Sequence, residues 1–188
     1  MLSLNKINKL MDYSLSDSDV LALINNQANL ILYPQLHTYN NIDDILGPFG
    51  ACILLYESKP NYGHWCAIFK VTNNELEFFN SYGDATPHEG LPDGTLKFIP
   101  EDFRKVSNQD HTYLAKLMVD SPYNLSYNQY KFQSEGPNIK TCGRHVATRL
   151  NLRHLSLDEY YRLIKKYCKE LNLTSDQVVS YFTSSVDK

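Results

Sequence analysis

The sequence predicts a single mixed α+β domain of 188 residues. Helix-compatible spacing dominates the last third, and three strand-like runs separated by turns occupy the middle third. Fourteen Tyr and eight Phe suggest a core that contains β-sheet. No repeat or Gly/Ser/Pro-rich linker divides the chain, so we expect one domain over 1–188, with a helical part at 1–47, a β-rich part at 51–133 and a helical part at 142–188.

Two helix-start signals stand in the N-terminal part. Ser16 with Asp19 three residues later resembles a capping box, and the apolar stretch 20–24 follows it, which predicts a first helix. Two adjacent asparagines at 40–41 offer a cap for a short helix through residue 46, which a Gly-Pro pair would end.

The middle third is predicted to form a three-stranded meander. Runs rich in strand-forming residues are joined by two short turns, which places strands at 51–56, 64–71 and 75–80. A long loop, a helix and a strand-like stretch are expected next, at 83–94, 112–119 and 123–132.

The last third is predicted to be helical. Residues 142–152 have helix-compatible spacing after a Gly-Pro-Asn turn. Ser156 caps a longer helix with an apolar stripe, made by Leu157, Tyr160, Ile164, Tyr167 and Cys168. Thr174 is expected to cap a final helix through Phe182.

Composition excludes several classes of protein. A formal charge of −3 excludes a generally basic nucleic-acid binder, although it leaves room for a local basic face. No apolar run is long enough for a membrane span, and no signal peptide precedes residue 11. We therefore expect a soluble intracellular protein whose four cysteines stay reduced.

Cys142 is the candidate nucleophile. It opens a predicted helix, where unpaired backbone N–H groups and the helix dipole stabilise a thiolate. Cys52 and Cys66 lie in predicted strands and Cys168 lies on an apolar helix stripe, positions typical of small core residues. No G-x-S-x-G or phosphate-binding loop offers another mechanism.

His64 is the candidate base, and Asn80 is the residue expected to orient it. If their strands form a hairpin, both residues lie at the edge far from the turn, and Cys-His-Asn is a known form of the catalytic triad. His145, three residues after Cys142, is an alternative base that is more typical of helix surface or packing. Gln133 could supply an oxyanion-hole N–H together with the backbone N–H of Cys142.

These residues stand in short motifs that resemble the adenovirus maturation protease and the related Ulp-type cysteine proteases. The motifs are Gly63-His64-Trp65, Phe79-Asn80-Ser81-Tyr82-Gly83, and Gln133 ahead of Gly136-Pro137-Asn138 and Thr141-Cys142-Gly143. The order His, acid or amide, Gln, Cys is that of the family and the reverse of papain's. The resemblance covers about residues 50 to 150, and relatives of this kind occur in large DNA viruses, virophages and Maverick-type elements.

The resemblance implies a cysteine-protease fold with a central mixed sheet flanked by helices and the catalytic cysteine at a helix N-terminus. It implies an endopeptidase that processes capsid or core proteins during virion maturation through a thioester, with small residues next to the scissile bond. No cofactor is expected beyond a peptide or DNA activator. The residues it assigns are the catalytic Cys142, His64, Asn80 and Gln133, and the substrate-binding Trp65 and Gly143.

Two departures from the family leave alternatives open. Asn80 stands where the family usually has Asp or Glu, and an amide orients an imidazole without stabilising its positive charge. The gap between Gln133 and Cys142 is longer than the family's usual one, so Gln129 is a second candidate for the oxyanion donor.

Other functions remain open. The same site could serve a ubiquitin- or SUMO-type isopeptidase. Alternatively, His64, Cys66, Cys142 and His145 could form a zinc site in a binding module without catalytic activity, although we expect no metal.

Residues 131–169 hold nine Lys or Arg and three Asp or Glu, which indicates a solvated helix face or a weak DNA contact. The expected location is the host cytoplasm or a virus factory, with packaging in the virion.

Overall fold

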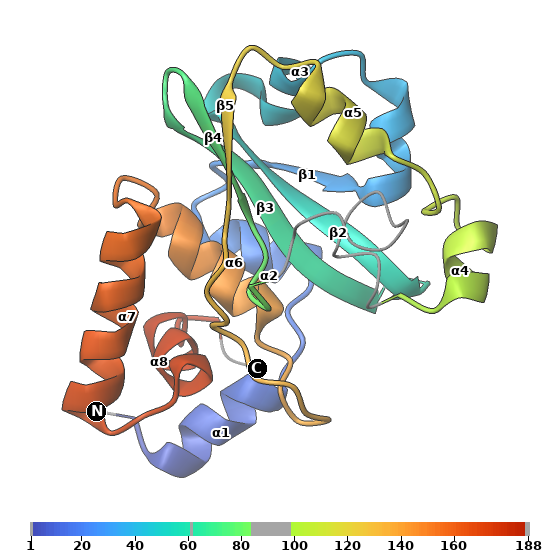
Figure 1. Ribbon diagram of the computed structural model, residues 1–188. Coiled ribbons are helices and arrows are strands. Elements are labelled where there is room, and N and C mark those ends of the chain that lie inside the picture. Colours follow the sequence, from blue (N-terminus) through green and yellow to red (C-terminus); the bar gives the residue numbers. More distant parts are fainter. Residues whose placement is uncertain (1, 61, 84–98, 187–188) are drawn as a thin grey trace.

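A five-stranded mixed sheet forms the centre of the molecule (Figure 1). The computed structural model describes residues 2–60, 62–83 and 99–186. The strands follow one another across the sheet in chain order, and their bounds are β1 Asn29–Leu32, β2 Ala51–Lys59, β3 Tyr62–Thr72, β4 Glu75–Phe79 and β5 Asn124–Tyr127. β2, β3 and β4 pair antiparallel, whereas β1 and β5 pair parallel to β2 and β4. The α+β class and the predicted meander are confirmed.

Helices cover both faces of this sheet (Figure 1). One face packs on α2 (Asp17–Leu23), α6 (Cys142–Asn151), α7 (Leu157–Leu171) and α8 (Ser175–Phe182). The other packs on the short helix η1 (Tyr33–Thr38), on α3 (Ile42–Leu46) and on α5 (Tyr113–Val119). Since β2 is covered on both faces, its first six residues are all buried, which explains why the sequence shows a continuous apolar run there.

The predicted helix-start signals lie where expected. Ser16, Ser156 and Thr174 each cap a helix with a complete capping box, and Asn41 caps α3. Gly47 ends α3 with a positive φ of 57°, a conformation that favours glycine. These signals are local to the chain, so the sequence alone reveals them.

Several elements were not predicted. Helix α1 (Leu4–Asp12), strand β1 and helix α4 (Glu101–Val106) are absent from the predicted elements, and β5 ends at Tyr127 rather than at residue 132. The short helix η2 (Gly47–Phe49) follows α3 directly. The expected helical part at 1–47 therefore also contains a strand, because four residues are too few to show a strand pattern. Beyond Gly83, the expected 83–94 loop lies outside the described residues.

Helix α6 runs through the core, with every residue from Gly143 to Leu150 buried. Arg149, expected on a solvated face, instead forms a two-pronged ion pair with Glu77 at 2.6 and 2.8 Å and donates to two backbone carbonyls. Arg144 is also buried, and it donates to the carbonyl oxygens of Leu10 and Thr183. These two arginines therefore add nothing to a basic surface.

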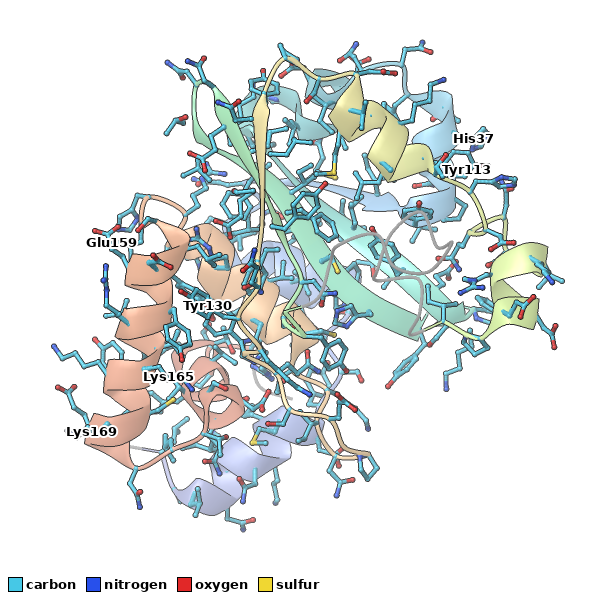
Figure 2. The ribbon with its side chains drawn as sticks, in the orientation of Figure 1. His37, Tyr113, Tyr130, Glu159, Lys165 and Lys169 are labelled. Carbon is cyan, nitrogen blue, oxygen red and sulfur yellow. The ribbon has the colours of Figure 1, made fainter. Side chains whose placement is uncertain are left out.

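Most of the basic side chains that stay exposed in this region lie on α7. Figure 2 shows Lys165 and Lys169 along this helix, both exposed. Lys131 and Lys140 belong to the same predicted basic segment, but they pair with Glu135 and Asp12 at 2.7 and 2.9 Å. No helix within the described ranges combines the length and apolar character that a membrane span requires.

Candidate active site

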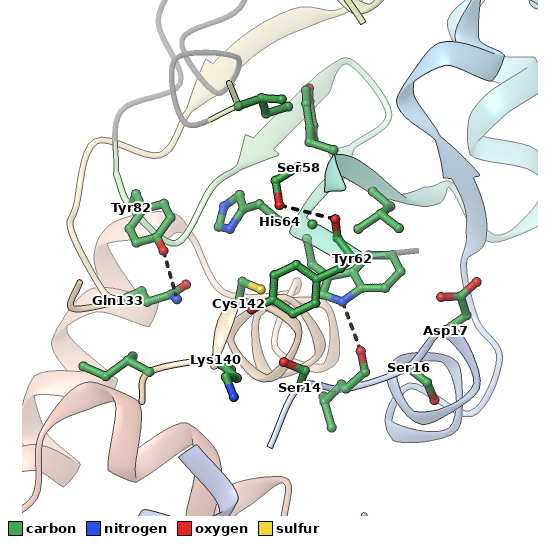
Figure 3. A pocket seen from close by; sticks show the side chains of 17 residues that line it. Ser14, Ser16, Asp17, Ser58, Tyr62, His64, Tyr82, Gln133, Lys140 and Cys142 are labelled. Atoms are coloured by element: carbon green, nitrogen blue, oxygen red, sulfur yellow. Dashed lines mark hydrogen bonds between the residues drawn. The ribbon is translucent and has the colours of Figure 1, made fainter. Parts of the chain in front are cut away.

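A cleft of about 570 Å³ is lined by four of the six predicted site residues, namely His64, Trp65, Gln133 and Cys142 (Figure 3). Among the described residues, its wall comes from the loop between α1 and α2 with the start of α2, the β2–β3 hairpin, the chain after β4, Ile99 ahead of α4, and the segment that leads into α6. The side chains that matter for chemistry are those of His64, Trp65, Tyr82, Gln133 and Cys142. Residues more than 75 positions apart in the sequence therefore share one cavity.

The bond between His64 and Asn80 fixes the form of the imidazole. Asn80 is fully buried, and its Oδ1 accepts from the backbone N–H of Tyr82 at 3.0 Å, which identifies that atom as the oxygen. Nε2 of His64 lies 2.8 Å from the same Oδ1, so it must carry a hydrogen and donate. In the neutral ring, Nδ1 is therefore unprotonated. A general base needs such a nitrogen with a free lone pair to accept a proton.

Burial keeps the His64 imidazole uncharged. The ring of Tyr82 stacks on it with centroids 4.7 Å apart and planes 18° apart. Burial lowers the pKa of His64 to about 4. The hydrogen bond to Asn80 raises the pKa and compensates part of this effect, and the nearby His145 lowers it further. The imidazole is therefore neutral at pH 7.

Cys142 is the first residue of α6 and lies half-buried at the cleft. Burial raises the pKa of its thiol above the ordinary value, although hydrogen bonds from the backbone of Trp65, Gly143 and Cys142 itself oppose that rise. Both shifts favour a protonated thiol and a neutral imidazole at neutral pH over a thiolate–imidazolium ion pair.

Gln133 is held so that its side-chain amide faces the cleft. Its backbone N–H donates to the carbonyl of Ser81 at 2.9 Å, so the side chain is the donor that remains for a substrate. The Ser81 hydroxyl donates to Oε1 at 2.6 Å, which leaves Nε2 directed toward the Tyr82 hydroxyl at 3.4 Å (Figure 3). Gln129 is exposed and does not line the cleft, so the structure favours Gln133.

Trp65 and Gly143, the two residues expected to bind substrate, differ in their position relative to the cleft. Trp65 lines the cleft, and its indole N–H donates to the carbonyl of Leu15 at 3.4 Å. Gly143 is buried, and a Cβ there would lie 3.0 Å from Val20 and 3.1 Å from Trp65. The missing side chain lets α6 approach Trp65 and Val20, and the expected role of Gly143 beside a substrate backbone stays a prediction.

His145 and Cys66 do not join the site. His145 is fully buried and its Nε2 lies 3.1 Å from Asp176. Cys66 belongs to the core cluster on the sheet face away from α6, whereas Cys142 packs against the cluster that contains α6. In the described part of the chain, no group of three or more His, Cys, Asp or Glu side chains is arranged to hold a metal ion. The four residues considered for zinc therefore do not come together.

Sequence reasoning missed several parts of the cleft. The α1–α2 loop contributes Ser14, Leu15 and Ser16 to its wall and α2 contributes Asp17, although the N-terminal 45 residues add little to the family resemblance. Ser81 and Tyr82 stood in a motif that was noticed, yet their contacts with Gln133 and His64 depend on how three separate segments meet. No sequence signal pointed to Asp176.

Comparison with known proteins gives one family relationship. No protein-family model matches the sequence. The chain is 45% identical over 170 residues to the Sputnik virophage protein named Uncharacterized protein V9, a match that covers 90% of this chain and 94% of that protein. The chain belongs to the family of this virophage protein. The relationship supports a virophage or viral origin, and it names no activity.

Proposed function

We propose that this protein is a cysteine endopeptidase. The observation that supports this best is the meeting, in one cleft, of a thiol at a helix start, an imidazole with a fixed tautomer and an amide donor. Cys142 would be the nucleophile, His64 the general base and acid, and Asn80 the residue that orients the ring. The side chain of Gln133 and the backbone N–H of Cys142 would bind the oxyanion.

The reaction follows from these roles. Nδ1 of His64 takes the thiol proton as the sulfur of Cys142 attacks the scissile carbonyl carbon, and the carbonyl oxygen becomes an oxyanion held by the two donors. His64 gives its proton to the amine nitrogen as the C–N bond breaks, which leaves a thioester on Cys142. Water then attacks the thioester carbonyl and His64 accepts a proton from it. The C–S bond breaks, His64 returns the proton to the sulfur of Cys142, and the carboxylic acid product leaves.

The resting neutral pair shapes this mechanism. Because the imidazole is neutral and the thiol protonated, proton transfer has to accompany attack on the substrate. Asn80 holds the ring without supplying a negative charge that would stabilise imidazolium. The positive charge that forms on His64 during the reaction would then be stabilised mainly by the negative charge on the nearby oxyanion.

The virophage relationship suggests a biological setting. A protease of this origin would process capsid or core proteins during virion maturation, act in the host cytoplasm or virus factory, and be packaged in the particle. The family resemblance adds a preference for Gly or other small residues beside the scissile bond.

The test compares wild type with Cys142→Ala on a library of intact proteins and on the virophage structural proteins, with new N-termini identified by mass spectrometry. New termini made only by wild type, clustered after small residues, are the expected result. Labelling by a ubiquitin vinyl sulfone probe without such termini would indicate an isopeptidase instead. Identical termini from both proteins would overturn the proposal.

A further inference from the structure

Asp176, the second residue of α8, is a buried carboxylate with only 1% of its surface exposed. Three groups donate to it: the hydroxyl of Thr141 at 2.5 Å and Nε2 of His145 at 3.1 Å to Oδ1, and the backbone N–H of Ser134 at 3.0 Å to Oδ2. A carboxylate accepts all three bonds at once, which a neutral side chain of this size cannot do.

Two of these donors adjoin the proposed catalytic residues. Ser134 directly follows Gln133, and Thr141 directly precedes Cys142. The third donor, His145, lies one turn into the helix that Cys142 opens. One carboxylate therefore touches the chain beside both groups that would form the oxyanion hole.

The other contacts of the segment between Gln133 and Cys142 lie mostly at the surface, and they include the ion pairs of Glu135 with Lys131 and of Lys140 with Asp12. Residues 134–138 are exposed, so core packing does not fix their course. Within this segment the backbone N–H of Lys140 donates to the Met11 carbonyl at 2.8 Å, and that of Ile139 donates to Gly136. The neighbouring Ser175 hydroxyl also donates to the carbonyl of Phe132, so the start of α8 holds the chain on both sides of Gln133.

We propose that Asp176 is a positioning residue that fixes the Gln133 amide relative to the start of α6. This inference rests on the proposed function and adds a residue from the C-terminal helix to the site. Both ends of the loop between Gln133 and Cys142 are bonded to this one side chain. Oxyanion donors need placement to within a fraction of an ångström, since a displacement of about 1 Å can cost ~100-fold in rate.

The carboxylate is ionised in this setting. Burial alone would raise the pKa of Asp176, but the bonds from His145, Thr141 and Ser134 together hold it below the ordinary value. An amide at this position keeps one acceptor oxygen and turns an N–H toward one of the donors. Asp176→Asn is therefore a graded change that preserves shape, and Asp176→Ala removes all three bonds.

The experiment compares wild type, Asp176→Asn and Asp176→Ala, with Glu77→Gln as a control for the loss of a buried carboxylate that pairs with Arg149. Steady-state kinetics on a substrate that wild type cleaves give kcat and KM separately. The enzyme concentration is taken as the amount of Cys142 that can be alkylated. Hydrogen exchange followed by mass spectrometry measures the protection of residues 133–142, a readout that needs no substrate.

For Asp176→Ala we expect kcat to fall by about 10- to 100-fold while KM changes less than ~3-fold. Asp176→Asn should lower kcat by a smaller factor. In both variants, hydrogen exchange should become faster only at residues 133–142. Glu77→Gln is expected to lower the melting temperature and leave kcat per active site unchanged.

Unchanged exchange at 133–142 in either Asp176 variant would overturn the inference, as would a kcat within twofold of wild type in a folded Asp176→Ala protein. If wild type cleaves nothing, the protease proposal fails. Hydrogen exchange alone then decides whether Asp176 fixes the chain beside Gln133 and the start of α6. Should Asp176→Ala not fold, Asp176→Asn supplies both measurements.

Discussion

The charge state of the His64–Cys142 pair can be tested by titration. His64 has its pKa lowered from 6.5 to about 4 because the ring is buried. At about 1.4 kcal/mol for each pKa unit, this difference corresponds to roughly 3 kcal/mol of preference for the neutral ring. The thiol pKa of Cys142 is raised, also by burial. Both shifts favour the neutral pair.

Two assays follow the pair as pH changes. NMR of the histidine ring protons, with His64→Ala used for assignment, is expected to show His64 neutral from pH 8 to below pH 5. The rate of Cys142 alkylation by iodoacetamide is expected to rise continuously with pH above neutrality as the thiol ionises. A flat alkylation rate between pH 5 and 8, together with a protonated His64, would show an ion pair and refute this reasoning.

The same shift predicts how stability depends on pH. Because the folded-state pKa of His64 lies below its unfolded value of 6.5, the unfolded chain binds more protons between pH 6.5 and about 4. The free energy of unfolding is therefore expected to fall as the pH drops through that window. His64→Ala should remove up to roughly 3 kcal/mol of this dependence, measured by urea unfolding at several pH values. An identical pH dependence in wild type and variant would contradict the assignment.

Four further substitutions test the site and its surroundings. Asn80→Ala is expected to lower kcat/KM by about 10- to 100-fold because only ring orientation is lost, and an unaffected variant would mean that another group holds the imidazole. Gln133→Ala should cost about 100-fold in kcat whereas the exposed Gln129→Ala changes little, and the reverse result would show that the wrong glutamine was chosen. Gly143→Ala should lower the free energy of unfolding by about 1 kcal/mol in urea, since the new methyl overpacks against Val20 despite its helix propensity, and a stabilised variant would refute that packing argument.

The sequence was sufficient wherever the determining signals are local. Ser16, Asn41, Ser156 and Thr174 cap helices through side-chain bonds to residues only three positions away, so four helix starts could be predicted. The meander was predictable because its turns are short. His64 and Asn80 could be paired in advance because the antiparallel register pairs Phe79 with Ala67, so the chain that continues after β4 runs toward the start of β3.

The rest depends on contacts between distant segments. Arg149 was interpreted as a surface charge because Glu77, its partner 72 positions away, gives no local sign of the pairing. The close packing of Gly143 against Val20 and Trp65 gave no sign in the sequence, because Val20 lies 123 positions away and Trp65 lies 78 positions away. Asp176 lies 35 positions after Thr141, and only the docking of α8 brings the two together.

The central claim is that Cys142 forms a covalent bond with its substrate. Acid quenching of wild type during turnover of a peptide containing an identified cleavage site, followed by intact mass and peptide mapping, detects this bond directly. The account predicts an acyl adduct whose mass matches the N-terminal product, located on Cys142 and absent from Cys142→Ala. Cleavage that proceeds without an adduct and persists in Cys142→Ala would contradict it.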